Sequence, residues 1–492
     1  MLILLFALTS SILKPTSLYE ISTRPYLYLL GQKLGKTVTL RDIPESEFDD
    51  WKNKGFEWVW FMGVWQVGDI GLKHDRETDN LKNSYNENLP GWNNDDVIGS
   101  PYAIVQYTVN TAIGTLEDIA WIREELHKRG MKLMLDFVPN HSALDAPEVT
   151  SKVNFYIRAP NGQVSSSKYW NNGIAFGCGK WCDPWTDVAQ YNYFDEGLRQ
   201  HQIDVLKFIA SVADGARCDM AHLIISAQFE DYWRNELNAY GYSRPSREFW
   251  EEAISTVKSS YPEFRFLAES YSDNEANLIN LGFDFAYDKV PYDKLTYKDA
   301  PGFIQEIWNR NRDYKSHCCF FTENHDEKRA VANFFYNYQA ANAAAGALLT
   351  LPGMRFFNQE QWNGPSNKID VHLRRANYEQ PNQACVTFYD KLFQVLKLEC
   401  MTQGEFTQLN VDGSNSIAAW KYSYGDEHVL VAVNFADNQA GGWIKISDAP
   451  QGSNIPVLEM ISGETYYRDG NELRNSGIFV LLNQYQVQIF KY

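Results

Sequence analysis

The chain has 492 residues, of which 44% are hydrophobic, 15% aromatic and 22% charged. This length is sufficient for two or three domains with a large core. The formal net charge of -17 at pH 7 argues against nucleic acid or an anionic membrane surface as a partner.

The N-terminal segment is apolar and uncharged as far as Leu13. It is typical of the hydrophobic part of a secretory signal, although the first basic residue is Lys14 and no small-x-small cleavage site follows. It is shorter than the about 20 apolar residues that a membrane-spanning helix needs. We therefore expect a signal peptide within residues 1–17 and a secreted or lumenal protein. The alternative is a buried lead-in to the first strand in a cytoplasmic protein.

Short β-rich runs separated by helix-length sequence fill most of the chain. Strands are expected at residues 18–22, 58–64, 132–138, 215–220, 264–268, 283–287, 317–322 and 353–357. A helix is expected after Thr115, because Asp118 completes a capping box and Gly130 ends the apolar pattern. Eight strands alternating with helices predict a (β/α)8 barrel over residues 18–400.

Two regions depart from this alternation. Residues 142–194 are rich in Asn, Gly, Trp, Tyr and Pro and are too long for one helix, so they predict a loop domain inserted after the third strand. Alternating strands with turn residues over 401–492 predict a C-terminal antiparallel β-sandwich. Within the insert, Cys178 and Cys182 are spaced to close a small disulfide, which fits secretion. Cys218, Cys318 and Cys319 lie in strand-like runs and are expected to be reduced core residues.

Polar groups stand at the ends of four predicted strands. The segments are Asp136–His141, Gly215–Asp219, Ala268–Glu269 and Asn324–Asp326. Because the carboxyl ends of barrel strands open onto one shared face, we expect these groups to gather there. Three carboxylates at one point suit acid–base and nucleophilic chemistry on a sugar acetal.

Two of these groups have an interpretation from their neighbours alone. Arg217 and Asp219 are two residues apart on a strand, so both point to the same side. The guanidinium then keeps the acid ionised and oriented, as a nucleophile needs, the alternative being a structural ion pair. Glu269 looks exposed at the end of an apolar strand, where lost solvation favours the protonated form of a general acid. Its alternative is an ordinary solvated glutamate.

At these segments the chain resembles the alpha-amylase family of glycoside hydrolases, family 13. The four family motifs occur in their usual order, and the resemblance extends from about Leu18 to about Phe357. It implies a retaining double displacement at α-glucosidic bonds. Asp219 would be the nucleophile, Glu269 the general acid/base, and Asp326 the third carboxylate, which holds ring hydroxyls and helps to distort the sugar.

The resemblance also assigns supporting roles around the cleavage point. Arg217, His141 and His325 would bind the substrate, and Tyr102 is a candidate platform for the sugar. Asp136 and Asn192 would support the site structurally. For the histidines and Tyr102, the alternative is an ordinary packed side chain.

The chain departs from the family pattern after the nucleophile. Many members have Lys or Arg three residues on and His four residues on, whereas this chain has His222 and Leu223. His222 is therefore expected in an atypical leaving-group subsite that favours short oligosaccharides over starch. Asn140 matches a position that often binds structural calcium, an ion with about six to eight oxygen ligands. No dependable acidic partners are recognisable in the insert, so we expect no required cofactor and weak or absent calcium dependence.

The leading functional prediction is a retaining glycoside hydrolase acting on an α-glucan or a maltooligosaccharide, with no nucleic acid partner and no membrane span. One alternative is a transglucosylase, because both reactions share the glycosyl-enzyme and differ in the acceptor. A second is a catalytically silent relative that binds glucan, although all three carboxylates are present. A metal-dependent barrel hydrolase would need converging His and carboxylate ligands. The sequence leaves bond preference, chain-length preference and oligomeric state open.

Overall fold

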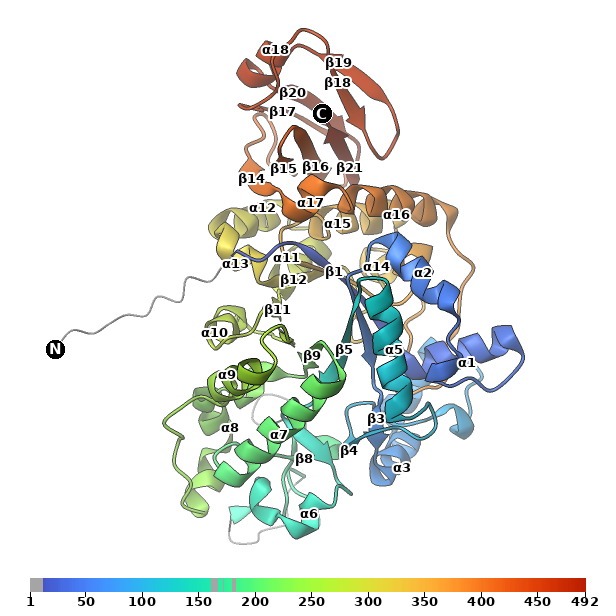
Figure 1. Ribbon diagram of the computed structural model, residues 1–492, viewed down its shortest axis with the longest axis vertical. Coiled ribbons are helices and arrows are strands. Elements are labelled where there is room, and N and C mark those ends of the chain that lie inside the picture. The colour runs from blue at the N-terminus through green and yellow to red at the C-terminus, as the bar shows by residue number, and fades with distance from the viewer. Residues whose placement is uncertain (1–11, 161–166, 171, 179–182) are drawn as a thin grey trace, which may run out of the picture.

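The computed structural model describes residues 12–160, 167–170, 172–178 and 183–492. Eight parallel strands close into a barrel at its centre (Figure 1). In barrel order they are β1 (Thr16–Ser22), β13 (Met354–Phe357), β12 (Cys318–Phe321), β11 (Phe285–Tyr287), β10 (Arg265–Ala268), β9 (Gly215–Cys218), β5 (Lys132–Phe137) and β2 (Trp58–Met62). Each strand begins and ends within two residues of its predicted bounds, so the predicted barrel is confirmed.

Helices surround the barrel because each carries one apolar face. Thr115 precedes α5 (Leu116–Lys128) as its N-cap residue. Its Oγ1 accepts a hydrogen bond from the Asp118 N–H at 3.3 Å, and the Asp118 carboxylate accepts one from the Thr115 N–H at 2.9 Å. This is the predicted capping box. The longer helices are α1 (Thr23–Leu34), α2 (Glu45–Lys54), α3 (Asp69–Glu77), α4 (Asp79–Asn88), α5 (Leu116–Lys128), α7 (Glu196–Val212), α8 (Ser226–Ala239), α9 (Phe249–Ser260), α11 (Lys289–Thr296), α12 (Ala300–Asn309), α15 (Tyr338–Leu348) and α16 (Gln383–Leu396). The shorter ones are α6 (Glu148–Ser151), α10 (Glu275–Asn280), α13 (Arg312–Ser316), α14 (Ala330–Asn333), α17 (Glu399–Gln403) and α18 (Gly470–Asn475).

Two excursions leave the barrel at the carboxyl ends of its strands. After β5 the chain forms a three-stranded sheet in the order β6 (His141–Ala143), β8 (Trp185–Gln190), β7 (Phe176–Gly177). Cys178 in this region is disulfide-bonded, whereas Cys182, its predicted partner, lies outside the described residues. A two-stranded antiparallel ribbon of β3 (Trp65–Val67) and β4 (Ile104–Val109) follows β2. The chain between its two strands contains α3 and α4. The sequence pattern did not predict this second excursion.

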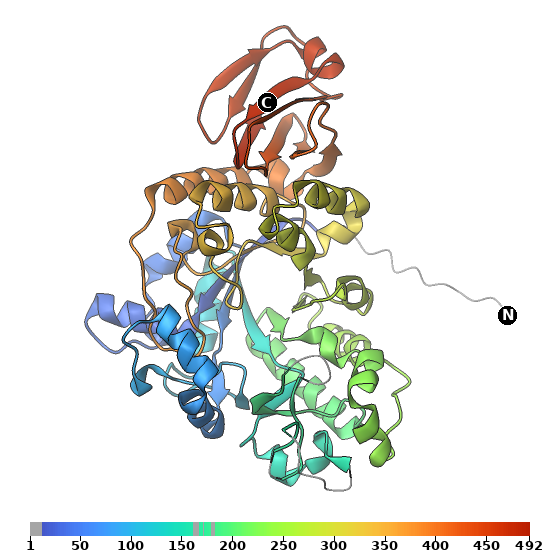
Figure 2. The same ribbon diagram turned by 180° about the vertical axis from the view of Figure 1, so that it is seen from behind.

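The C-terminal part is antiparallel, which fits the predicted sandwich. Its larger sheet has the order β14 (Glu405–Leu409), β15 (Ile417–Tyr424), β16 (Glu427–Asn434), β21 (Gln486–Lys491), β18 (Ile455–Glu459), β19 (Thr465–Arg468). The smaller one pairs β17 (Ala440–Ile444) with β20 (Ile478–Leu482). Figure 2 and Figure 1 both place these sheets at one end of the molecule and the sheet of β8 at the other.

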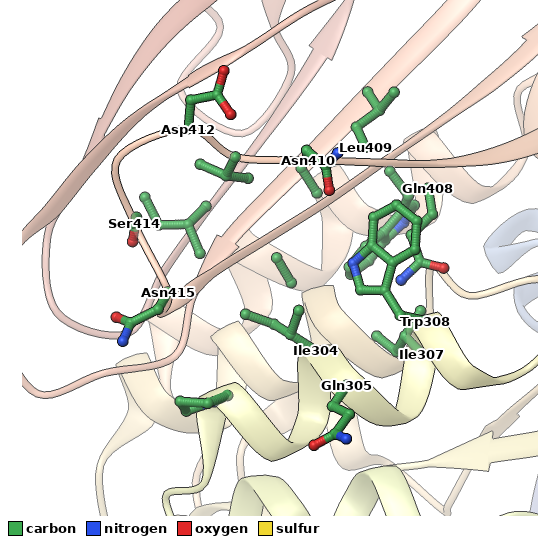
Figure 3. A pocket seen from close by; sticks show the side chains of 16 residues that line it. Ile304, Gln305, Ile307, Trp308, Gln408, Leu409, Asn410, Asp412, Ser414 and Asn415 are labelled. Atoms are coloured by element: carbon green, nitrogen blue, oxygen red, sulfur yellow. The ribbon is translucent and has the colours of Figure 1, made fainter.

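The seam between the barrel and the C-terminal sheets is tied by buried polar contacts. Trp420 Nε1 donates to Thr350 Oγ1 at 3.2 Å, and the Tyr422 hydroxyl donates to the Thr350 carbonyl at 3.0 Å. Beside the seam lies a cavity of about 390 Å³, in which Trp308 of α12 faces residues of β14 and β15 (Figure 3).

The cysteines predicted to be reduced, Cys218, Cys318 and Cys319, are free and buried.

Candidate active site

A pocket of about 550 Å³ opens at the carboxyl ends of the barrel strands. Its lining brings together five of the side chains that the sequence predicted for the site, which are Tyr102, His141, Asp219, Glu269 and Asp326. They come from the ribbon after β2, from the insert and from the ends of β9, β10 and β12. The barrel therefore gathers residues that are far apart in the chain onto one face.

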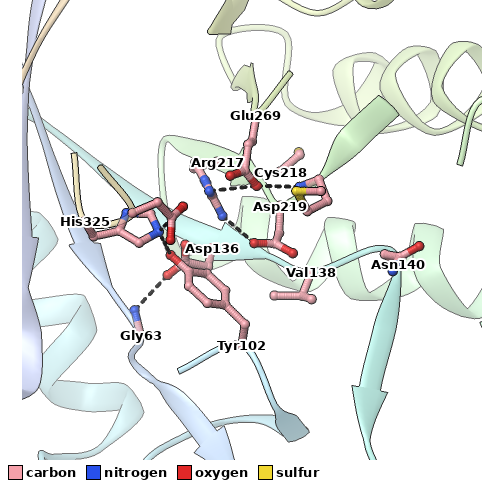
Figure 4. A network of polar contacts seen from close by, with 12 residues as sticks. Gly63, Tyr102, Asp136, Val138, Asn140, Arg217, Cys218, Asp219, Glu269 and His325 are labelled. Atoms are coloured by element: carbon pink, nitrogen blue, oxygen red, sulfur yellow. Dashed lines mark hydrogen bonds and ion pairs between the residues drawn. The ribbon is translucent and has the colours of Figure 1, made fainter. Parts of the chain in front are cut away.

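Arg217 holds two of the carboxylates. Its Nη1 lies 2.7 Å from Asp219 Oδ1 and its Nη2 lies 2.8 Å from Glu269 Oε2 (Figure 4). The guanidinium is fully buried and lies within 5.1–5.8 Å of the ring centres of Trp60, Tyr102 and Tyr287. Since a single guanidinium spans both acids, it fixes them side by side.

Asp219 differs from its expected state. Burial raises the pKa of its carboxyl, repulsion from Glu269 adds to the rise, and Arg217 opposes it. The ion pair with Arg217 is present as predicted, but it does not by itself keep Asp219 ionised, because desolvation is the larger effect. Asp219 therefore binds a proton more readily than an exposed aspartate does.

Glu269 is not exposed, as its strand-end position suggested, but only 2% accessible. Its Oε2 accepts the backbone N–H of Met220 at 2.6 Å, and its Oε1 accepts the Tyr271 hydroxyl at 3.0 Å. Met220 has φ 42° and ψ 41°, the left-handed conformation that non-glycine residues seldom adopt. The residue directly after Asp219 is thus bent so that its N–H reaches the second carboxylate.

His325 links Asp326 to a buried glutamate that the sequence analysis missed. Its Nδ1 lies 2.6 Å from Glu20 Oε1, and its Nε2 lies 3.1 Å from Asp326 Oδ2 and 2.8 Å from the Tyr102 hydroxyl. Burial lowers the pKa of His325, but Asp326 and Glu20 outweigh burial and raise it to about 10. A charged residue in the apolar strand Thr16–Ser22 was the available signal for Glu20.

Asp326 keeps its charge at the mouth of the pocket. Its side chain is 48% exposed, whereas that of His325 is fully buried. The imidazolium of His325 holds the pKa of this carboxyl well below its usual range. The pocket therefore presents one fixed anion beside the pair that Arg217 holds.

The remaining predicted residues lie around this core. Asp136 accepts the Gly63 N–H at 2.8 Å and Trp60 Nε1 at 3.1 Å, and burial raises its pKa to about 6. Burial lowers the pKa of His141 to about 3, so this imidazole is neutral. His222 lines a neighbouring cavity of about 580 Å³, and Met220 lines both this cavity and the active-site pocket. Burial lowers the pKa of His222 to about 4.

Asn192 and Asn140, like Asp136, Arg217, His222 and His325, do not line the active-site pocket. Asn192 accepts the Phe194 N–H at 3.1 Å, which is a local structural contact. Asn140 Oδ1 accepts Gln190 Nε2 at 3.0 Å, and the same Nε2 lies 2.9 Å from the Asn140 carbonyl and 3.1 Å from the Tyr191 carbonyl. The oxygens that a cation would need at Asn140 are thus already bound to an amide nitrogen.

Comparisons with known proteins agree with this arrangement. A family model described as "Alpha amylase, catalytic domain" matches residues 100–394. The chain is 28% identical to the alpha-amylase MalA of Haloarcula japonica over 54% of its own length, and it spans 36% of that relative. It is 24% identical to an oligo-1,6-glucosidase of Bacillus cereus, over 96% of this chain and 86% of the relative. The fold is similar to that of a maltogenic alpha-amylase from Thermotoga neapolitana, with a TM-score of 0.71, 18% identity and coverage of 97% and 98% of the two chains.

The contact between Glu20 and His325 predicts a pH-dependent stability. A histidine whose folded pKa is about 10, above an unfolded value of about 6.5, contributes stability that is complete below about pH 6.5 and is lost as the pH rises toward 10. Glu20→Gln removes one of the two acids that raise this pKa. We expect the variant to be less stable at pH 7 by about 1–3 kcal/mol and to lose less stability than the wild type between pH 7 and 10.

Urea denaturation at several pH values measures both effects. Glu45→Gln is the matched control, because the Glu45 side chain is 77% exposed. If the free energy of unfolding changed with pH in the same way for the wild type and for Glu20→Gln, His325 would not titrate as its contacts imply.

Proposed function

Because the chain belongs to the alpha-amylase family, we propose that it is a glycoside hydrolase that cleaves α-glucosidic bonds of oligo- or polysaccharides with retention of configuration. The observation that carries this proposal is the position of Asp219 and Glu269 on one guanidinium, at 2.7 and 2.8 Å. Retaining glycosidases need two carboxyls that are close together, at about 5–5.5 Å, so that one attacks while the other donates a proton. The shared contact with Arg217 supports such a close approach, and we expect the two carboxyls to lie at this separation.

The first step forms a bond between Asp219 and the anomeric carbon. As the glycosidic bond breaks, Glu269 gives its proton to the leaving oxygen, which departs as an alcohol. Arg217 contacts both carboxyl groups, so it stabilises the negative charge on Asp219 before the step and on Glu269 after it.

The second step releases the sugar. Water gives a proton to the Glu269 carboxylate and attacks the anomeric carbon, which restores the free Asp219 carboxylate. Two inversions at one carbon give net retention. Asp326 and His325 hold ring hydroxyls of the same sugar, and Tyr102 supports its apolar face. Neutral His141 donates a hydrogen bond to the same sugar.

A transglucosylase shares every step up to the glycosyl-enzyme, and it differs when a sugar hydroxyl replaces water. The residues described here act identically in both reactions, and hydrolysis remains the leading proposal. A catalytically silent glucan-binding protein is disfavoured, because the three carboxylates lie in one pocket with a cation between two of them.

Removing either carboxyl of the pair tests the mechanism. We expect Asp219→Ala and Glu269→Ala to lower kcat on 4-nitrophenyl α-glucoside or maltooligosaccharides by at least about 10³-fold, because each loses one step of the double displacement. Added azide should rescue both variants. It should give the β-glycosyl azide with Asp219→Ala, by one displacement, and the α-glycosyl azide with Glu269→Ala, by two.

Glu263→Gln is the control, since its side chain is 83% exposed two residues before β10. Product configuration by NMR separates the two roles. Wild-type activity in either alanine variant, or the same azide anomer from both, would contradict the assignment.

Calcium dependence is a separate proposal that rests on Asn140. Asn140 Oδ1 and two backbone carbonyls surround Gln190 Nε2 within 3.1 Å, so a neutral amide holds the oxygens together. Among the described residues no group of three or more His, Cys, Asp or Glu side chains is arranged to hold a metal ion. We propose that Gln190 joins the insert to the barrel without calcium.

Dialysis against a chelator is therefore expected to leave activity and melting temperature unchanged, whereas Gln190→Ala lowers the melting temperature. Truncation removes donors from buried carbonyls, which costs about 1–3 kcal/mol, and calcium is not expected to restore the loss. Calorimetric melting with and without calcium measures this. A chelator-sensitive wild type that recovers on adding calcium would contradict the proposal.

We also propose that the protein is exported, from the apolar segment Met1–Leu13. Residues 1–11 of this segment lie outside the described residues. Within the described part of the chain, no helix has the length and apolarity to cross a membrane. Mass spectrometry of protein from its native source should find an N-terminus after the leader, and an intact Met1 on cytosolic protein would contradict export.

A further inference from the structure

The seam between the barrel and the C-terminal sheets contains a cavity that the proposed mechanism does not use. Its volume of about 390 Å³ lies within the range of about 300–1,000 Å³ that is typical of small-molecule sites. Helix α12 forms one wall, and β14, β15 and the loop between them form the other. The cavity shares no lining residue with the active-site pocket. The C-terminal sheets and the sheet of β8, which contributes to the lining of the active-site pocket, lie at opposite ends of the molecule in Figure 1 and Figure 2.

Trp308 presents an aromatic ring to this cavity (Figure 3). The residue is 46% exposed, although tryptophan is mostly buried in folded proteins. Ile304 precedes it by four residues on α12 and lines the same cavity, so the two side chains share one face of the helix. Phe303 and Ile307 are buried in the core and attach α12 to it. Trp308 is thus not needed to anchor the helix, and its ring is available to a ligand.

Free hydrogen-bonding groups lie around this ring. Gln408 and Asn410, at the end of β14, line the wall that faces α12. Gln408 Oε1 accepts a hydrogen bond from Lys315 Nζ at 3.0 Å, which orients the amide. Gln408 Nε2, the side-chain amide of Asn410 and the indole N–H of Trp308 have no hydrogen-bond partner among the residues that the structure describes. Polar groups that can still bind a ligand therefore stand beside an exposed apolar ring.

The charge and polarity of the lining identify the class of ligand. Among the described residues that form it, Asp412 alone has an ionisable side chain. A phosphate or carboxylate group would find no cation in this lining, and Asp412 would repel it. A purely apolar ligand would cover the free amides and leave them without partners. A neutral sugar meets both conditions, because its C–H face packs on an aromatic ring while its hydroxyls donate and accept hydrogen bonds.

We propose that this cavity binds a segment of an uncharged α-glucan, with the sugar on Trp308 and its hydroxyls on the amides of Gln408 and Asn410. The inference rests on the proposed function for the identity of the sugar, and it adds a binding site that is separate from the site of cleavage. Because the two sites have no residue in common, the protein stays attached to a polymeric substrate here while its active-site pocket remains open.

Native gel electrophoresis with and without soluble starch in the gel measures this binding without requiring cleavage. We expect starch to retard the wild type, and Trp308→Ala to raise the apparent Kd for starch by about 5-fold or more, because the apolar platform is lost. Asn410→Ala should raise it by about threefold, the effect of losing one neutral hydrogen bond. For 4-nitrophenyl α-glucoside, kcat/KM should stay within about twofold in both variants, because neither residue lines the active-site pocket.

Tyr467→Ala is the matched control, since Tyr467 is also an exposed aromatic residue of the C-terminal sheets, at 60%, but does not line the cavity. A wild type that starch does not retard, or an equal Kd for the wild type and both variants, would overturn the site. If Trp308→Ala does not fold, Asn410→Ala decides alone, because Asn410 is exposed and its truncation leaves the core intact.

The two proposals fail separately. Retardation that depends on Trp308, in a protein that cleaves no α-glucoside, would support this site and refute the proposed function. The alternative occupant of the cavity is a second copy of the chain. Light scattering that shows a dimer in the wild type and a monomer in Trp308→Ala would identify a contact between copies and overturn the glucan site.

Discussion

The burial of the Arg217 guanidinium is the constraint on which the site depends. A charge removed from water is tolerated only where opposite charges or hydrogen bonds compensate for its lost solvation. Asp219 and Glu269 supply that compensation at 2.7 and 2.8 Å, and aromatic rings close the remaining sides. Asp219 and Glu269 are therefore held by the same interaction that makes the buried cation stable, so loss of Arg217 would affect both folding and the proposed chemistry.

A second buried cation, His325, is stabilised by opposite charges in the same way. His325 is fully buried between Glu20 and Asp326, and its positive charge balances two acids as Arg217 does. The base of the pocket thus holds two buried cations, each paired with two acids. Such a floor has little freedom to reorganise when a sugar enters, which is the condition under which fixed dipoles and charges stabilise a transition state well.

The sequence predicted those features of the fold and the site that follow from a local residue pattern together with the topology of the barrel. Each barrel strand is a short β-rich run, and the groups that follow the runs have one place to go, the carboxyl face. Glu20 was missed because it lies inside a strand rather than after it, and its partner is about 300 residues away. The ribbon of β3 and β4 and the packing of α3 against β8 were missed for a related reason. Their segments lack a regular period, and nothing in the chain order indicates that they meet.

The peptide that follows Asp219 has a consequence for how this site can change. Met220 donates its N–H to Glu269 and also adopts an unusual left-handed conformation. Asp219 and Glu269 are thus linked by this backbone contact as well as by their shared cation. A substitution that moves one of these carboxyls would therefore move the other as well, so a change of specificity that spares both acids has to come from the surrounding loops.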